Sequence, residues 1–157
     1  MLPVATIRVE TSIFAPPEIC FDLARDLGTH VRSAAFSAER VIPPGRTSGH
    51  LEVGDLVTFE GRHFGIRQRL TARITELDRP RRFVDEMVNG PFKWLRHMHD
   101  FKGVPNGTLM VDVLEWEAPL GAVGRIADAL FLKRHMRWFV VTKQRHLKQI
   151  AEATAGS

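Results

Sequence analysis

Two histidines at positions 97 and 99 are the residues of this sequence whose type and spacing best suit chemistry. In a β-strand, side chains two residues apart point to the same face, so these two imidazoles can approach one another or a shared partner. Imidazole titrates near neutral pH and serves as a general acid, a general base or a metal ligand. The pair therefore suits acid–base chemistry, metal binding or recognition of a polar group.

Two carboxylates and a third histidine are candidates to join this pair. Asp112 falls on the next strand of a predicted hairpin, where it can oppose the two histidines. Asp85 is the second carboxylate, and His63 points inward only if its strand continues past Gly61. The apolar residues in phase with these groups are Phe83 and Met87 for Asp85, Met110, Leu114 and Trp116 for Asp112, and Leu95 and Phe101 for the histidine pair.

Three interpretations of this set stay open. A His-x-His pair with a carboxylate could bind a divalent metal, but further converging ligands are not indicated, so we predict no metal and no other cofactor. A His–Asp pair in a pocket could carry out acid–base chemistry, such as an aldol-type cyclisation or a dehydration. A cluster of hydrogen-bonded polar groups could instead orient the polar end of a ligand or satisfy itself. The absence of tyrosine weakens the cyclase interpretation, because tyrosine is a common proton donor.

The segments that must position these residues begin with a strand at residues 5–14, which alternates apolar and polar side chains. A short helix is predicted to start at Pro16 and Pro17 and to end at Gly28, and a second covers residues 30–36. A short strand at residues 40–42 follows. Five more strands are predicted at residues 56–62, 64–77, 82–89, 92–102 and 108–117. Their short connections indicate an antiparallel meander.

A helix of about thirty residues is predicted from Ala122 to about Ala153, followed by a frayed tail. Its apolar residues recur at spacings of three and four and form a stripe that must cover one face of the sheet. The stripe contains Ile126, Ala129, Leu130, Met136, Phe139, Val140, Leu147 and Ile150. The basic residues outside it could dock on an anionic membrane or a protein, although a solvated face is the simpler interpretation; they are Arg134, Arg137, Arg145 and Lys148.

The composition is that of one soluble globular domain of 157 residues, with 44% hydrophobic and 25% charged residues. No stretch approaches the roughly 20 apolar residues of a membrane-spanning helix, and residues 1–5 do not resemble a signal peptide. Cys20 is the single cysteine, so we expect no internal disulfide and a cytoplasmic location. The charge of +4 is spread along the chain, so we predict neither a nucleic-acid partner nor stable membrane insertion. The oligomeric state is not indicated.

The order of these elements and several short segments resemble one known superfamily. The segments are Ile13-Phe14-Ala15-Pro16-Pro17-Glu18, Cys20-Phe21-Asp22-Leu23, Gly54-Asp55, His63-Phe64-Gly65, Gly90-Pro91-Phe92, His97-x-His99-x-Phe101 and Pro119-Leu120-Gly121. They resemble a bacterial branch of the START-related (SRPBCC) superfamily, which includes birch-pollen-allergen-like and polyketide cyclase/dehydrase-like proteins. The resemblance covers nearly the whole chain. It implies a single START-like α+β domain over residues 1–157 with the helix-grip fold, in which a curved seven-stranded antiparallel sheet wraps around the C-terminal helix.

This resemblance implies a cavity between sheet and helix that binds or carries a small hydrophobic ligand or lipid. The alternative is a cyclase or dehydratase that acts on a polyketide-like or aromatic substrate by His/Asp chemistry. Periodicity alone does not say which face of residues 82–89 and 92–102 lines the cavity, but the resemblance favours the histidine side. The candidate cavity residues are His63, Asp85, Met87, Leu95, His97, His99, Phe101, Met110, Asp112, Leu114, Met136, Phe139 and Val140.

Overall fold

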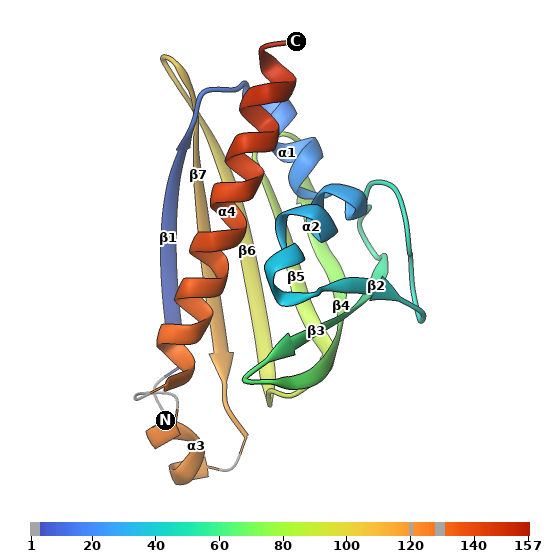
Figure 1. The fold of residues 1–157 in the computed structure, drawn as a ribbon, viewed down its shortest axis with the longest axis vertical. Coiled ribbons are helices and arrows are strands. Elements are labelled where there is room, and N and C mark those ends of the chain that lie inside the picture. Colours follow the sequence, from blue (N-terminus) through green and yellow to red (C-terminus); the bar gives the residue numbers. More distant parts are fainter. Residues whose placement is uncertain (1–3, 120, 128–130) are drawn as a thin grey trace.

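A seven-stranded antiparallel sheet curves around the C-terminal helix in the computed structural model, which describes residues 4–119, 121–127 and 131–157 (Figure 1). The strands are β1 (Ala5–Ile13), β2 (Arg40–Ile42), β3 (Leu56–His63), β4 (Ile66–Asp78), β5 (Arg82–Asn89), β6 (Trp94–Val104) and β7 (Gly107–Glu117). Their spatial order is β1-β7-β6-β5-β4-β3-β2. Strands β3 to β7 form a meander, and β1 pairs with β7, the last strand. The predicted α+β helix-grip architecture is confirmed.

Two short helices lie between β1 and β2, as the sequence predicts. Helix α1 (Pro17–Ala24) has a proline in its first turn and buries Cys20 completely. Helix α2 (Leu27–Ser33) is followed by the 3-10 turn η1 (Ala35–Ser37). The prediction that Gly28 ends the first helix is wrong, because Asp26 starts the second one: its carboxylate accepts a hydrogen bond from the backbone N–H of Thr29 at 2.8 Å.

The C-terminal region contains two helices, α3 (Gly121–Ala127) and α4 (Lys133–Ala155), where the sequence predicts a single long one. Helix α3 lies at the end of the sheet and not across its face, so Ile126 of the predicted stripe is 62% exposed (Figure 1). Ala129 and Leu130 lie outside the described residues. No helix in the described part of the chain is long and apolar enough to cross a membrane.

Helix α4 stays regular to Ala155, so the prediction of a frayed tail from about Ala153 is wrong. Its last turns are tied to the end of β1: the carboxylate of Glu152 accepts a hydrogen bond from the backbone N–H of Phe14 at 3.0 Å, and Lys148 donates to the carbonyl of Ser12 at 2.6 Å. Arg137 likewise donates to a β1 carbonyl. The sheet therefore anchors part of the basic face that was a candidate docking surface.

A two-residue turn joins β3 to β4. Phe64 and Gly65 both have positive φ, 54° and 72°, which is typical of a tight hairpin turn. Phe64 is 58% exposed, and Ile66, the first residue of β4, is 62% exposed. The strand predicted over residues 64–77 therefore begins only after this turn, at Ile66.

A cluster of buried aromatic and aliphatic side chains fills the region where α1 meets the sheet and α4. Phe21 of α1 contacts Phe83 and Phe101 edge to face, with ring centroids 5.4 Å apart in each case. Met110 of β7 and Leu147 of α4 belong to the same buried cluster. Large side chains thus fill this end of the space between sheet and helix, and the remaining space is left toward the other end.

Candidate functional site

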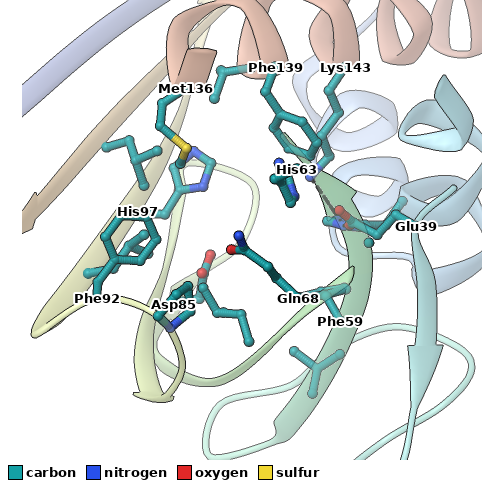
Figure 2. A pocket seen from close by; sticks show the side chains of 18 of the residues that line it. Glu39, Phe59, His63, Gln68, Asp85, Phe92, His97, Met136, Phe139 and Lys143 are labelled. Atoms are coloured by element: carbon teal, nitrogen blue, oxygen red, sulfur yellow. Dashed lines mark hydrogen bonds and ion pairs between the residues drawn. The ribbon is translucent and has the colours of Figure 1, made fainter. Parts of the chain in front are cut away.

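A cavity of about 350 Å³ lies between the concave face of the sheet and helix α4 (Figure 2). Aromatic and aliphatic side chains make up most of its wall, and several titratable groups border it. Most of the candidate residues line it: His63, Asp85, Leu95, His97, His99, Leu114, Met136, Phe139 and Val140. The tertiary structure also settles which face of β5 and β6 is inside, namely the face of Asp85 and of the two histidines.

Four candidate residues do not line the cavity. Phe101 and Met110 are buried in the core cluster, because Phe21 of α1 occupies the space in front of them. Met87 packs at the edge of a second apolar cluster. Asp112 is fully buried in the sheet and reaches the site only through the histidines.

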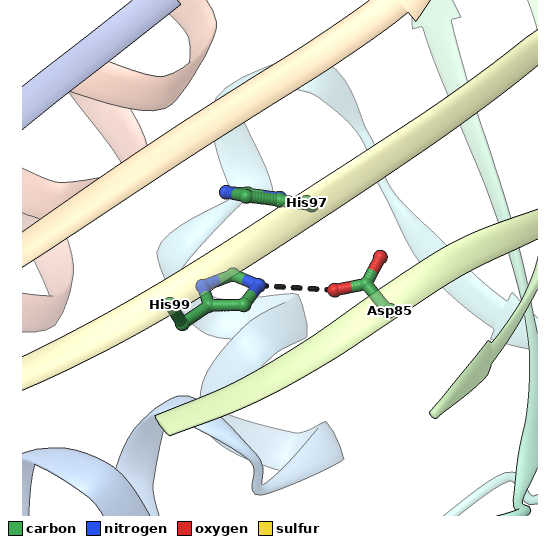
Figure 3. Close-up of side chains that lie close together, drawn as sticks. All are labelled: Asp85, His97 and His99. Atoms are coloured by element: carbon green, nitrogen blue, oxygen red, sulfur yellow. Dashed lines mark hydrogen bonds and ion pairs between the residues drawn. The ribbon is translucent and has the colours of Figure 1, made fainter. Parts of the chain in front are cut away.

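The register of three neighbouring strands brings Asp85, His97, His99 and Asp112 together, and we call these four residues the sheet cluster. His97 of β6 is paired with Asp85 of β5, and His99 of β6 is paired with Asp112 of β7. Nε2 of His99 lies 3.0 Å from Oδ2 of Asp85 (Figure 3). Its Nδ1 lies 2.9 Å from Oδ1 of Asp112, and Nε2 of His97 lies 3.0 Å from the same oxygen.

These contacts separate the protonation states of the two imidazoles. Burial disfavours the charged form of His99, but the carboxylates of Asp112 and Asp85 outweigh burial and raise the pKa of His99 to about 9. Burial and the neighbouring charge of His99 lower the pKa of His97. Although burial opposes it, the pKa of Asp112 is also held well below its ordinary value by both histidines. At neutral pH, His99 is therefore an imidazolium between two carboxylates, and His97 is neutral.

The sheet cluster also contains a possible metal-binding group. Asp85, His97 and His99 each offer one donor atom, and the three atoms lie within 4.8 Å of one another. Two imidazoles and a carboxylate are ligands that suit a divalent transition metal. A metal on His99 would have to replace the proton that this ring shares with Asp85, so metal and imidazolium are alternative states of one site.

A second group of titratable side chains borders the cavity on the side of α2, and we call it the lysine cluster. Nζ of Lys143 on α4 lies 2.9 Å from Nδ1 of His30 on α2. Nε2 of His30 is hydrogen bonded to Glu39, which precedes β2. None of these residues is predicted as a site residue from the sequence. One signal was available: Lys143 falls four residues after Phe139 and four before Leu147, on the apolar stripe of the helix.

A histidine pair joins β3 to α4 beside the cavity. The strand runs on past Gly61, as an inward His63 requires, and Nδ1 of His63 lies 2.9 Å from Nε2 of His135. Burial lowers the pKa of both imidazoles. The carboxylate of Glu39 opposes this effect at His63, whereas the neighbouring His63 lowers the pKa of His135 further. A hydrogen bond between two imidazoles needs a lone pair on one of them, so His63 and His135 stay hydrogen bonded only while at least one ring is neutral.

No family model matches the chain, and no curated protein matches it. Three solved structures resemble it over nearly their whole lengths. TTHA0849 from Thermus thermophilus is 21% identical with a TM-score of 0.78, over 96% of this chain and 99% of that one. The Zhui aromatase/cyclase from Streptomyces sp. R1128 is 12% identical with a TM-score of 0.76, over 96% and 94%.

The third structure is major latex-like protein 151 from Panax ginseng, 13% identical with a TM-score of 0.70 over 94% of this chain and 97% of that one. At these identities the likeness concerns the fold. Strand order, the two short helices after β1 and the gripped C-terminal helix all agree with it. The chain therefore has the helix-grip fold that it shares with these structures.

Proposed function

We propose that the protein binds or carries a small hydrophobic ligand or lipid in the cavity between the sheet and α4. The observation that carries this proposal is the cavity itself: about 350 Å³ in volume, with a mainly apolar wall and a few polar groups. Pockets of this size and character are the usual sites of small apolar molecules that carry one polar end. Phe92, Met136 and Phe139 offer flat and flexible apolar contacts along the wall (Figure 2).

The polar end of the ligand is proposed to lie toward the strands. His97 and Asp85 border the cavity there, and Gln68 of β4 points into it (Figure 2). One further polar atom of the cavity lining, Oε1 of Gln144 on α4, is buried and has no hydrogen-bond partner. Buried polar atoms are normally satisfied, so a polar ligand group or a water that reaches this oxygen would gain a hydrogen bond.

Native mass spectrometry of freshly purified protein, followed by titration with a fluorescent apolar probe, tests this proposal. We expect a co-purified apolar adduct and saturation at about one probe per chain, because one cavity with a mainly apolar wall lies between the sheet and α4. Gln68→Trp fills the cavity and should weaken probe binding at least about tenfold, since the probe and the indole compete for one volume. The matched control, Arg73→Trp, places the same ring on the exposed face of the same strand and should leave binding unchanged. Many weak sites, or equal binding in both variants, would refute the proposal.

Acid–base catalysis on a polyketide-like or aromatic substrate is the second candidate. It is favoured by a neutral His97 beside a buried carboxylate at the cavity wall, and a protein of similar fold is an aromatase/cyclase. A neutral imidazole held by a carboxylate is suited to accept a proton. We expect turnover of a supplied polyketone that His97→Phe abolishes while apolar probe binding persists; absence of any turnover by the wild type would reject this candidate.

A further inference from the structure

The amine of Lys143 is held in the cavity wall without a carboxylate partner. Among the described residues, no Asp or Glu oxygen lies within 4.0 Å of its Nζ, and the contacts of this nitrogen are to the imidazole of His30. Lysines away from bulk water are usually paired with a carboxylate, because an unpaired buried ammonium is costly. Lys143 is therefore placed as a free amine would be, and not as half of an ion pair.

His30 is held in the tautomer that leaves Nδ1 unprotonated beside this amine. Its Nε2 is bonded to Glu39, a carboxylate that is only 7% exposed, so Nε2 carries the hydrogen and Nδ1 is the free base. Nζ of Lys143 lies against the ring, 2.9 Å from Nδ1 and 3.5 Å from Nε2. The ring is further fixed by stacking on Phe59, with centroids 4.2 Å apart. An amine, a base and a carboxylate that orients the base form the arrangement that activates nucleophiles in proteins.

The surroundings of Lys143 favour the uncharged amine. Burial lowers its pKa, and this outweighs the opposing effect of the carboxylates that face it from neighbouring elements, Glu39, Asp85 and Asp112. The pKa of His30 is lowered as well, first by burial and then by Lys143. Lysines in such apolar settings serve as nucleophiles toward carbonyl compounds.

We propose that Lys143 forms an imine with ligands that carry an aldehyde or ketone on an apolar body. This inference rests on the proposed ligand-binding function and names the chemical class of ligand that the cavity retains. The apolar wall would hold the body of the ligand, and the carbonyl carbon would meet Nζ at the lysine cluster. His30 is the base of this step, and Glu39 positions His30.

The step balances without an oxidant or a reductant. Nζ of Lys143 attacks the carbonyl carbon and forms the C–N bond, while an electron pair moves to the oxygen. One N–H proton passes through Nδ1 of His30 to that oxygen, which gives a carbinolamine. The second N–H proton follows the same route as the C–O bond breaks, so the oxygen leaves as water and the C=N bond forms.

Reductive trapping with 2-naphthaldehyde and borohydride tests the proposal on the intact protein. A trapped imine adds the mass of the aldehyde less one oxygen, and peptide mapping locates it. We expect one saturable adduct at Lys143, formed roughly tenfold or more faster than at Lys148, which is on the same helix but outside the cavity, half-buried and paired with Glu152. The rate at Lys143 should also reach its plateau below the pH at which an ordinary lysine amine titrates, because burial lowers its pKa.

Three variants separate the contributions of the lysine cluster. Lys143→Met should lose the adduct, and Lys148→Met, the matched control, should keep it. His30→Gln should slow adduct formation, and an unchanged rate would refute the role of His30. Because the map of the wild type locates the adduct by itself, the test does not depend on the folding of any variant.

The corresponding alcohol, 2-naphthalenemethanol, distinguishes this proposal from the ligand-binding function. It has the same apolar body but cannot form an imine, so it should bind the wild type reversibly and leave no adduct after borohydride treatment. If the alcohol binds and Lys143 is modified no faster than Lys148, the imine proposal is wrong and the binding function stands. If neither compound binds, both proposals fail.

Discussion

The sheet cluster and the lysine cluster border the same cavity but are built in opposite ways. In the sheet cluster, three adjacent strands hold one imidazolium between two carboxylates, so the positive charge has an acidic partner on each side. In the lysine cluster, a helix, a second helix and a loop bring together an amine, an imidazole and a carboxylate, and the amine faces the imidazole instead of the acid. The first arrangement stabilises charges, whereas the second keeps an amine reactive.

This difference predicts unequal costs when each cluster is disrupted. Removing a carboxylate from the sheet cluster leaves His99 as a buried charge with fewer partners, which is among the most destabilising changes a protein can suffer. Removing the amine of Lys143 takes away a group whose burial was itself unfavourable. Three measurements would sharpen or break the contrast.

The largest effect is expected for Asp112→Ala, which should lower the free energy of unfolding by about 3–5 kcal/mol, because Asp112 is fully buried and contacts both histidines. Urea unfolding measures this loss. Asp100→Ala is the control: it removes a carboxylate of β6 that is paired with Arg82 at a partly exposed site, and should cost about 1 kcal/mol or less. Equal losses in the two variants would show that the sheet cluster is not a buried charge network.

The pH dependence of stability should show the raised pKa of His99. Its folded pKa of about 9 lies above the value of roughly 6.5 for an unfolded histidine, so its contribution is fully present below pH 6.5 and is lost as the pH rises through 9. The expected loss is about 3 kcal/mol, measured by urea unfolding at a series of pH values.

Asp85→Asn is the comparison for this titration, because it keeps a partner for Nε2 of His99 but removes one negative charge. The fall in stability should then move to lower pH. Subtracting the free energies of unfolding of the two proteins at each pH removes the contribution of all groups that titrate alike in both. Superimposable profiles of stability against pH for the two proteins would contradict the assignment of His99 as an imidazolium held between two carboxylates.

The smallest effect is expected for Lys143→Met, which should change the free energy of unfolding by no more than about 1 kcal/mol in either direction. The hydrogen bond to His30 is lost, but an amine that is costly to bury is replaced by an apolar chain of similar length. The same urea titration applies. A loss as large as that of Asp112→Ala would mean that the two clusters depend on charge in the same way.

The sheet cluster was largely predictable because its geometry is local. His97 and His99 share a face by the period of a strand, and the two-residue connection between β6 and β7 sets the register that places Asp112 opposite His99. The predictions failed where a distant element decided the outcome. Phe101 and Met110 have the same phase as the cavity residues, but Phe21 of α1 fills the space before them and makes them core.

The sequence by itself determined the order of the strands and of the two short helices, the alternation of the strands and the shared face of His97 and His99, because each follows from periods of two to four residues and from short turns. Only the tertiary structure decided where the cavity lies and what faces it. His30 and Lys143 are 113 residues apart and meet because α2 and α4 pack at the same end of one curved sheet. No local period encodes such a contact, since it depends on how helices far apart in the chain settle on the sheet.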